Sequence, residues 1–370
     1  MRVLVVGAGF YGATCARELA VKGHSVLVVE KRDHVAGNCH TPLVPEVGCR
    51  KHAYGAHIFH TGSKRVWDYA CRFADFNRYR HQVRARSGKR VFSFPINLMT
   101  LQQVFGRSFT PEQARAKLER ERCHIPVPAN MEQWCLRTIG RRLYELFVEG
   151  YSEKQWGRHP KLLPAGIIKR IPVRLDYDES YFGSQLQGIP AGGYTEMVEE
   201  MLRGVSVELG VDYEKSKLTG ATSLLWNNPD LVIYTGPVDA YYGYRLGHLE
   251  YRSLRFEDEL LDVSDFQGNS VVNYLDRDVP FTRIIEHRHF DLLKGGSKTL
   301  ITREFPDEWS PGKVEFYPVN DEKNQALLRR YQELAVKETS VHFGGRLGSY
   351  LYYDMDMAMA SALKFCDGIG

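Results

Sequence analysis

The apolar residues at the start of the chain follow two different spacings. Residues 3–6 (VLVV) and 26–29 (VLVV) are short, mostly β-branched runs of the kind found in buried parallel strands. Residues 10–22 instead place small and apolar side chains on one helical face, and Gly23 follows as a helix terminator. The pattern predicts a strand, a helix and a second strand, as in a parallel α/β unit.

Helical spacing dominates residues 63 to about 150. Thr110 is placed as an N-cap, Pro111 as the first helical residue and Gln113 as the third, where it can complete a capping box. A second helix is predicted over residues 131–150, ending at the final glycine of that stretch. This part of the chain therefore reads as a largely helical domain.

Alternation of apolar and polar residues predicts strands from about 174 to 181 and again from about 251 to 305. The clearest runs are VVNYL (271–275), FTRIIEH (281–287) and KTLITREF (298–305). Consecutive strands of this kind favour an antiparallel sheet that could hold a substrate.

Three glycines follow the first predicted strand in a Gly-x-Gly-x-x-Gly pattern, at Gly7, Gly9 and Gly12. The first permits a tight turn, the second lets the backbone approach a pyrophosphate, and the third lets helix and strand pack closely. Glu30 closes the second strand, where it can bind ribose hydroxyls. Within a full strand–helix–strand unit, this pattern predicts a dinucleotide site.

Two further stretches favour FAD over NAD. Residues 30–38 (EKRDHVAGN) resemble the second flavin motif of FAD-dependent enzymes. Residues 341–365 read as a strand, a Gly-Gly-Arg turn and a helix that starts near Asp354, whose N-terminus would face the flavin. Residues 231–237 (LVIYTGP) resemble the strand and turn that return to such a domain.

The predicted fold class is α/β, with a discontinuous Rossmann-like FAD-binding domain, a helical domain and an antiparallel β-sheet domain. The FAD-binding domain is expected over 1–62, about 191–240 and 310–370. The helical domain is expected over about 63–165, and the antiparallel sheet domain over about 166–190 and 241–309.

Composition narrows the class of protein. The chain has 370 residues, 43% hydrophobic and 25% charged, and a net charge of +4 that argues for neither a nucleic-acid nor a membrane partner. Its seven cysteines have no CxxC pair, so neither a disulfide framework nor a zinc site is indicated and a cytoplasmic location is expected. Glycines and charges interrupt the N-terminal apolar stretch, which disfavours a signal peptide, and no apolar run is long enough for a membrane span.

Four stretches together resemble one family, the bacterial UDP-galactopyranose mutases. They are YGAHIFHT (54–61), GYSEKQWGR (150–158), KRIPVR (169–174) and GGRLGSYLYYDMD (344–356). The resemblance implies interconversion of UDP-galactopyranose and UDP-galactofuranose with no net redox change, through a covalent adduct between the sugar and N5 of reduced FAD. It also implies an external flavin reductant, a homodimer or higher homo-oligomer, and galactofuranose supply for cell-surface glycans.

The resemblance also implies a set of site residues. The catalytic residues would be Arg170, Arg283 and His60. Substrate would also contact His81, Phe147, Tyr151, Ser152, Trp156, Tyr181, Asn273, Tyr317 and Tyr352. The cofactor would contact Gly7, Gly9, Phe10, Gly12, Glu30, Lys31, Gly37, Asn38, His57, Ile58, Val211, Gly236, Arg346, Tyr353, Asp354, Met355 and Asp356. No metal is expected, because the HIFH spacing suits a metal only on a helix.

The sequence departs from the family pattern at two points. Val148 stands where many relatives have a second aromatic residue, and His81 stands where Asn is common. Residues 156–170 contain glycines and prolines that suit a hinged loop, which we expect to close over bound UDP and bring in Arg170. His287 and His289 are expected to share one face of a strand and to pack across it.

Two other functions remain compatible with parts of the sequence. The FAD domain alone fits an oxidoreductase of the amine-oxidase type, although an amine substrate has no use for a diphosphate clamp. A UDP-sugar or FAD-binding protein without catalysis is the other, although intact arginines and tyrosines argue against it.

Overall fold

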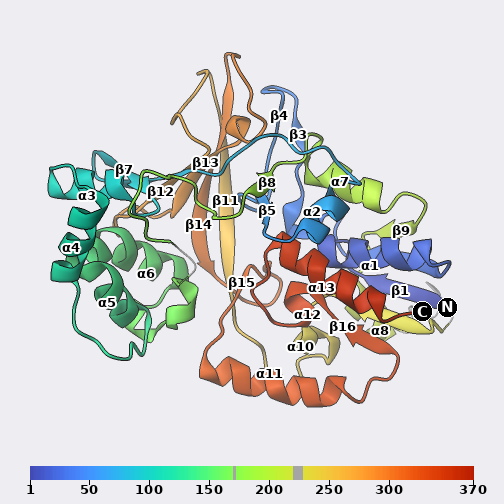
Figure 1. Ribbon diagram of the computed structural model, residues 1–370. Helices are drawn as coiled ribbons and strands as arrows, with labels where there is room; N and C mark the ends of the chain where they lie inside the picture. The colour runs from blue at the N-terminus through green and yellow to red at the C-terminus, as the bar shows by residue number, and fades with distance from the viewer. Residues whose placement is uncertain (170–171, 220–227) are drawn as a thin grey trace.

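Two sheets dominate the structure (Figure 1), a computed structural model that describes residues 1–169, 172–219 and 228–370. The first sheet has five parallel strands in the order β16-β10-β1-β2-β9. Their bounds are β1 Arg2–Val6, β2 Ser25–Glu30, β9 Ser206–Leu209, β10 Leu231–Tyr234 and β16 Val341–Phe343. Because β10 and β16 lie beside β1, segments far apart in the sequence build one sheet.

Helices from the two ends of the chain cover this sheet together. Helix α1 (Phe10–Val21) packs against α13 (Met355–Asp367), and Figure 1 shows the two side by side in blue and red. Ala13 and Ala16 of α1 and Ala362 of α13 are fully buried, and such small side chains let the helices approach closely. The predicted discontinuous Rossmann-like domain is confirmed.

The second sheet has seven strands in the order β15-β11-β14-β13-β12-β6-β7. All neighbours are antiparallel except β12 and β6. The bounds are β6 Val83–Ser87, β7 Arg90–Phe94, β11 Tyr251–Leu261, β12 Val271–Tyr274, β13 Arg283–Glu286, β14 Thr299–Glu308 and β15 Tyr317–Pro318. The three clearest strand predictions, now β12, β13 and β14, are confirmed.

Strands β6 and β7 fall within residues 63–165, which were expected to be helical, and both belong to the second sheet. The signal was present in the sequence. Val83 and Ala85 are buried while Arg84 and Arg86 are not, which is the period of two that marks a strand. The run is short and lies beside strongly helical sequence, so its alternation was missed.

The helices beyond β7 are α3 Leu98–Phe105, α4 Pro111–Glu121, α5 Met131–Tyr144 and α6 Gly150–Trp156, with a π-helical turn, η2 Glu145–Glu149, before α6. The capping box of Thr110 and Gln113 is confirmed. The predicted helix end at Gly150 is wrong, because the chain stays helical until Gly157 adopts a left-handed φ of 63°. Gly150 instead lets the helix approach a neighbouring backbone: a Cβ there would lie 2.8 Å from the carbonyl oxygen of Leu275.

Residues 174–181 form no strand, contrary to the prediction. The side chains of Asp176 and Asp178 accept backbone N–H groups two residues later, each at 2.9 Å, and so stabilise turns instead.

The prediction that His287 and His289 share a strand face is also wrong. Both lie in the 3₁₀ turn η5 (His287–His289) that follows β13. His287 Nε2 lies 2.7 Å from Thr302 Oγ1, whereas His289 faces Glu286. The alternating pattern of this run therefore ends at Glu286.

Further elements lie outside the two large sheets. They are β3 Leu43–Val44, β4 Cys49–Arg50, β5 Phe59–Thr61, α2 Lys64–Ala70, β8 Leu186–Gly188, α7 Gly193–Met201, α8 Tyr213–Thr219, α10 Val238–Tyr241, α11 Glu322–Ala335 and α12 Gly345–Gly348. Strands β5 and β8 pair with each other rather than joining either large sheet. Among the described residues, no helix has the length and apolar character needed to cross a bilayer.

The break within α5 gives a testable prediction about stability. Gly140 has a φ of 78°, and a Cβ there would lie 2.4 Å from the carbonyl oxygen of Glu121. We expect Gly140→Ala to lower the free energy of unfolding by about 3 kcal/mol, measured by urea denaturation. Gly106→Ala is the matched control, because Gly106 has a φ of 73° but open space around its Cβ position. It should cost only about 1 kcal/mol. Equal losses would contradict the steric explanation.

Candidate functional site

A cavity of about 870 Å³ is lined by residues from both large sheets. This volume lies at the large end of the roughly 300–1,000 Å³ typical of ligand pockets. At one end the lining comes from the turn between β1 and α1. At the other it comes from β12, β13 and β15. The cavity therefore joins the predicted dinucleotide site to the predicted substrate site.

The glycine turn after β1 has the close packing that its sequence predicts. A Cβ on Gly7, whose φ is 103°, would lie 2.1 Å from Thr235 Oγ1, and a Cβ on Gly12 would lie 2.0 Å from the carbonyl oxygen of Gly7. Above Gly9 a Cβ would meet nothing within 4 Å. Two glycines thus allow tight packing, and the third leaves open space through which a ligand can reach the backbone.

Two helix N-termini meet this end of the cavity. Helix α1 begins after Gly9 and α13 begins after Asp354, and neither N-cap residue donates or accepts a capping side-chain hydrogen bond. Phe10, the first residue of α1, and Met355, the first residue of α13, both line the cavity. Free N–H groups at the positive end of a helix dipole suit a pyrophosphate or an anionic flavin.

The acidic residue at the end of β2 is already hydrogen-bonded. The Glu30 carboxylate accepts the backbone N–H of Ala8 at 2.8 Å and that of Arg32 at 3.0 Å. The Arg32 guanidinium donates to Asn38 Oδ1 at 2.8 Å and lies over the Tyr54 ring at 4.4 Å. These bonds fix Glu30 and Asn38 at the cavity wall, where a ribose would meet them.

His57 presents a defined tautomer to the cavity. Its Nδ1 lies 2.8 Å from the carbonyl oxygen of Gly55, so Nδ1 carries the proton and Nε2 is left as an acceptor. Burial, together with the nearby Arg283 charge, lowers its pKa to about 4. His57 is therefore a neutral hydrogen-bond acceptor at neutral pH.

Arg283, on β13, pairs with a carboxylate that has no access to solvent. Its Nε lies 2.8 Å from Glu304 Oε2, and the side chains are 21% and 0% exposed. The two charges meet without the alignment of a hydrogen bond. Although burial opposes the charge, Glu304 raises the pKa of Arg283 above its usual range, so the guanidinium stays protonated. Within the residues that the structure describes, its Nη groups have no hydrogen-bond partner, so they can bind a ligand in the cavity that Arg283 lines.

Aromatic rings surround this cation. Tyr317 and Tyr352 stack with ring centroids 5.9 Å apart and planes 9° apart, and Trp156 lies 6.1 Å from Tyr317. Burial, followed by the Glu304 charge, raises the pKa of Tyr317, so its hydroxyl remains a donor. Tyr151 of α6 also lines the cavity. Flat rings and hydroxyl donors next to an arginine suit a nucleotide.

Two histidines and Phe182 form the wall between the two ends. His60 stacks on Phe182 with centroids 3.7 Å apart, and its Nε2 lies 3.9 Å from the Asp354 carboxylate. His81 lies 5.6 Å from the same ring. Burial, followed by the Arg283 and His60 charges, lowers the pKa of His81 to about 3, so its ring is neutral. Its Nδ1 lies 2.9 Å from the Tyr79 hydroxyl.

Arg346 lies at the cavity wall but is held by the protein. Its Nη1 and Nη2 donate to the carbonyl oxygens of Phe316 and Glu315 at 2.6 and 2.8 Å. Burial lowers its pKa. Any contact with a pyrophosphate would therefore use the remaining N–H groups of the fork.

Most of the predicted site residues line this one cavity. Those expected at the cofactor are Gly7, Gly9, Phe10, Gly12, Glu30, Lys31, Gly37, Asn38, His57, Ile58, Val211, Gly236, Arg346, Tyr353, Asp354 and Met355. Those expected at the substrate are His81, Tyr151, Tyr181, Asn273, Arg283, Tyr317 and Tyr352, and His60, expected to be catalytic, lines the cavity as well.

Four predicted residues of the described chain do not line the cavity: Phe147, Ser152, Trp156 and Asp356. Phe147 is buried against Phe92, 5.4 Å away between ring centroids, and so lies behind the wall. Arg170 lies outside the described residues.

Sequence reasoning missed several lining residues, among them Arg32, Tyr54, Phe182 and Thr235. Arg32 lies within residues 30–38 and Tyr54 opens residues 54–61, both recognised as motifs, and Phe182 directly follows Tyr181. Proximity to those motifs could have identified them. Thr235 lies within residues 231–237, which were recognised as a returning strand and turn, but its contact with Gly7 depends on how closely β10 approaches that glycine.

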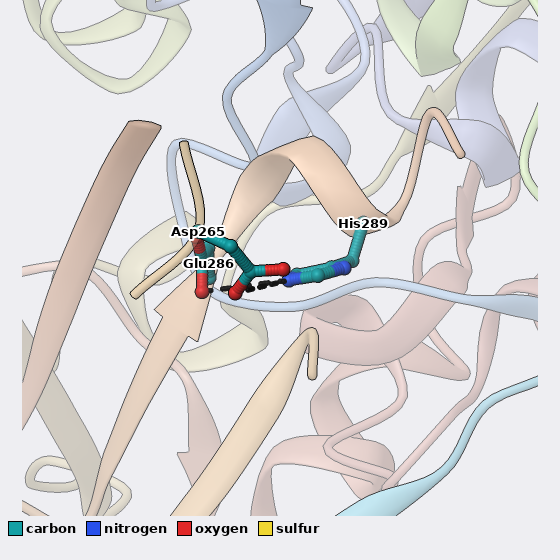
Figure 2. Close-up of side chains that lie close together, drawn as sticks. All are labelled: Asp265, Glu286 and His289. Carbon is teal, nitrogen blue, oxygen red and sulfur yellow. Dashed lines mark ion pairs between the residues drawn. The ribbon is translucent and has the colours of Figure 1, made fainter. Parts of the chain in front are cut away.

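A second group of titratable side chains lies away from the cavity (Figure 2). His289 Nε2 lies 3.4 Å from Glu286 and 3.5 Å from Asp265. Glu286 is fully buried and accepts the backbone N–H groups of Phe266 and Gln267, both at 2.9 Å. Its oxygens are thus already bonded, and the group links the end of β13 to the loop between β11 and β12.

Comparison with known proteins agrees with this site. The model of the UDP-galactopyranose mutase family matches residues 146–352, and the model of the NAD(P)-binding Rossmann-like domain matches residues 5–73. Both matches fall on segments that line the cavity.

Several curated relatives match over most of the chain. A probable UDP-galactopyranose mutase of Klebsiella pneumoniae is 39% identical, covering 99% of this chain and 94% of its own. A dTDP-fucopyranose mutase of Escherichia coli is 34% identical, covering 98% and 97%. A putative flavin-containing monoamine oxidase of Mycobacterium tuberculosis is 56% identical over only 45 residues, 12% of this chain and 10% of its own.

Solved structures share the fold. The crystal structure of a reduced UDP-galactopyranose mutase has a TM-score of 0.74 at 15% identity, covering 100% of this chain and 95% of its own. At that identity the likeness concerns the fold alone. The sequence matches carry the family assignment and confirm the motif resemblance. The chain belongs to the UDP-galactopyranose mutase family.

Proposed function

We propose that this chain binds FAD and interconverts UDP-galactopyranose and UDP-galactofuranose without net redox change. The observation that carries the proposal is the single cavity that joins a glycine turn fitted to a dinucleotide with Arg283 and its aromatic surroundings. A flavin and a UDP-sugar could meet there with their reacting groups shielded from water. Curated mutases that match over nearly the whole chain support it.

The flavin end would hold FAD by the groups already described. Gly9 and the α1 N-terminus would take the pyrophosphate, Glu30 the ribose, and the α13 N-terminus the flavin ring. The His57 Nε2 acceptor would meet a donor of the cofactor. When bound and reduced, FAD would supply its N5 nitrogen as the nucleophile toward the anomeric carbon of the sugar.

The other end would hold the UDP-sugar. Arg283 would bind the diphosphate through its free Nη groups, with Arg170 as a second cation. Hydroxyls of Tyr181, Tyr317 and Tyr352 would donate to the same oxygens. This arrangement stabilises the charge that grows on UDP as it leaves, which is the electrostatic part of the catalysis.

The base and the sugar would lie on either side of that clamp. Tyr151 would stack on the uracil, with Phe147 and Ser152 supporting it from behind, and Trp156 would shelter the ribose side. His60, His81 and Asn273 would border the sugar. The Asn273 amide lines the cavity and has no hydrogen-bond partner in the described part of the chain, so it remains available to a ligand.

The other candidate function, an oxidoreductase of the amine-oxidase type, has less support than the mutase. The monoamine oxidase relative matches only a short segment, as a shared dinucleotide motif would. A buried arginine with its own carboxylate serves an anionic ligand, not an amine. The homo-oligomer, the external reductant, the cytoplasmic location and the supply of galactofuranose for cell-surface glycans remain predictions of the family resemblance.

The first prediction concerns turnover. Purified protein loaded with FAD and reduced with dithionite should convert UDP-galactofuranose to UDP-galactopyranose, followed by chromatography. Oxidised protein is the control and should be inactive. The assay is repeated with dTDP-fucofuranose, because one relative is a dTDP-fucopyranose mutase. Turnover of neither sugar by FAD-loaded, reduced protein would refute the proposed function, and turnover of the dTDP-sugar alone would correct the substrate.

The second prediction concerns the diphosphate clamp. Arg283→Met should weaken UDP binding about a hundredfold in calorimetric titration, because a charge-assisted contact is lost. Removing the arginine also leaves Glu304 buried without a counter-charge, which should destabilise the fold by about 3–5 kcal/mol. The double variant Arg283→Met/Glu304→Gln separates the two effects. It should regain thermal stability but not UDP affinity; recovery of both would show that Arg283 serves the fold only.

A further inference from the structure

Lys154 of helix α6 forms hydrogen bonds to the β12–β13 connection. Its Nζ donates hydrogen bonds to the carbonyl oxygens of Tyr274 at 2.8 Å, Val279 at 3.1 Å and Phe281 at 3.0 Å. An ammonium has three donors, so every N–H of Lys154 is used. Among the described residues, no other lysine donates to three carbonyl oxygens; Lys22 donates to two, those of Cys366 and Ile369.

The three carbonyls lie beside residues of the cavity. Tyr274 directly follows Asn273, and Phe281 stands two residues before Arg283. Asn273 and Arg283 are paired across β12 and β13. The ammonium therefore forms hydrogen bonds at both ends of the β12–β13 connection. These ends lie directly next to Asn273 and Arg283, the two residues of β12 and β13 that line the cavity.

The helix side is equally close to the cavity. Tyr151 stands one helical turn before Lys154, and residues three apart lie on the same face of a helix. Lys154 is thus a short bridge between the element that carries Tyr151 and the element that carries Arg283. None of its own atoms needs to reach a ligand.

The rest of the contact between α6 and the β12–β13 connection is closely packed. At Gly150 a Cβ would lie 2.8 Å from the carbonyl oxygen of Leu275, so the helix cannot move closer. Arg277 adds ion pairs to Glu149 at 3.3 Å and Glu153 at 2.7 Å, but its side chain is 55% exposed. Such exposed pairs contribute little. Lys154 is the half-buried polar contact at the centre of the surface.

The surroundings of Lys154 affect the pKa of its ammonium group in opposite directions. Burial lowers its pKa to about 8, while the nearby Asp276 and Asp278 favour the charged form. At neutral pH the ammonium is still protonated and donates all three bonds. If the Lys154 side chain only filled space, an apolar residue there would stabilise the fold at least as well. The presence of a charged lysine therefore suggests that its hydrogen bonds hold α6 in position.

We propose that Lys154 is a positioning residue that sets the spacing between the Tyr151 side and the Arg283–Asn273 side of the pocket. The inference rests on the proposed function, in which a nucleoside contacts α6 and a diphosphate contacts β13. A ligand that spans both sides gains affinity only when the two contacts match its length. A ligand that touches one side alone is insensitive to that spacing.

The test compares a spanning ligand with a one-sided ligand. Lys154→Met, loaded with FAD, is titrated with UDP by calorimetry and with uridine by ligand-observed NMR. UDP affinity should fall at least tenfold, whereas uridine affinity should change less than twofold. Arg277→Gln is the matched control on the same surface, and both affinities should stay within twofold of the unaltered protein.

The outcomes separate this inference from the proposed function. Unchanged UDP affinity in Lys154→Met, or equal losses for UDP and uridine, would overturn the positioning role. Absence of UDP binding to the unaltered protein would instead refute the proposed function. If Lys154→Met does not fold, Lys154→Gln, which keeps two donors without charge, is measured in the same way and should show the same split.

Discussion

The site depends on one buried ion pair, that between Arg283 and Glu304. Glu304 is wholly inside the protein and Arg283 is at the cavity wall, with 2.8 Å between the charged atoms. A lone guanidinium would be costly to hold in so enclosed a place, and the carboxylate makes its charge permanent. The ion pair uses the Nε atom of Arg283, and its Nη groups have no hydrogen-bond partner in the described part of the chain. The enclosed pocket for an anion follows from this pairing.

The fold brings the rest of the site to that cation. Strands β10 and β16 return late segments of the chain to β1, so that the N-termini of α1 and α13 open onto the same cavity. Strands β12 and β13 supply Asn273 and Arg283, and α6 supplies Tyr151. Each end is chemically incomplete alone, since one fits a dinucleotide and the other an anionic nucleotide. Because both ends line one cavity, a flavin at one end could react with a nucleotide sugar at the other.

Patterns that arise within a few residues were readable from the sequence. The glycine turn, the capping box of Thr110 and the strands β12 to β14 were all predicted from local spacing. Features that depend on tertiary contact were not. The helix continues through Gly150 into α6, where Gly150 packs closely on Leu275, and the pairing of β6 with β12 joins segments nearly two hundred residues apart. For the site, motif resemblance located most lining residues, but it could not show that Phe147 lies behind the wall or that Glu304 holds Arg283.

If flavin and UDP occupy one continuous cavity, the binding of each should affect the other. This expectation is tested most directly by titrating UDP into FAD-loaded protein in the oxidised and the dithionite-reduced states while recording the flavin absorption spectrum. We expect a yellow protein whose flavin spectrum shifts on UDP binding and whose UDP affinity is higher in the reduced state. A flavin spectrum that ignores saturating UDP, with equal affinity in both states, would contradict it.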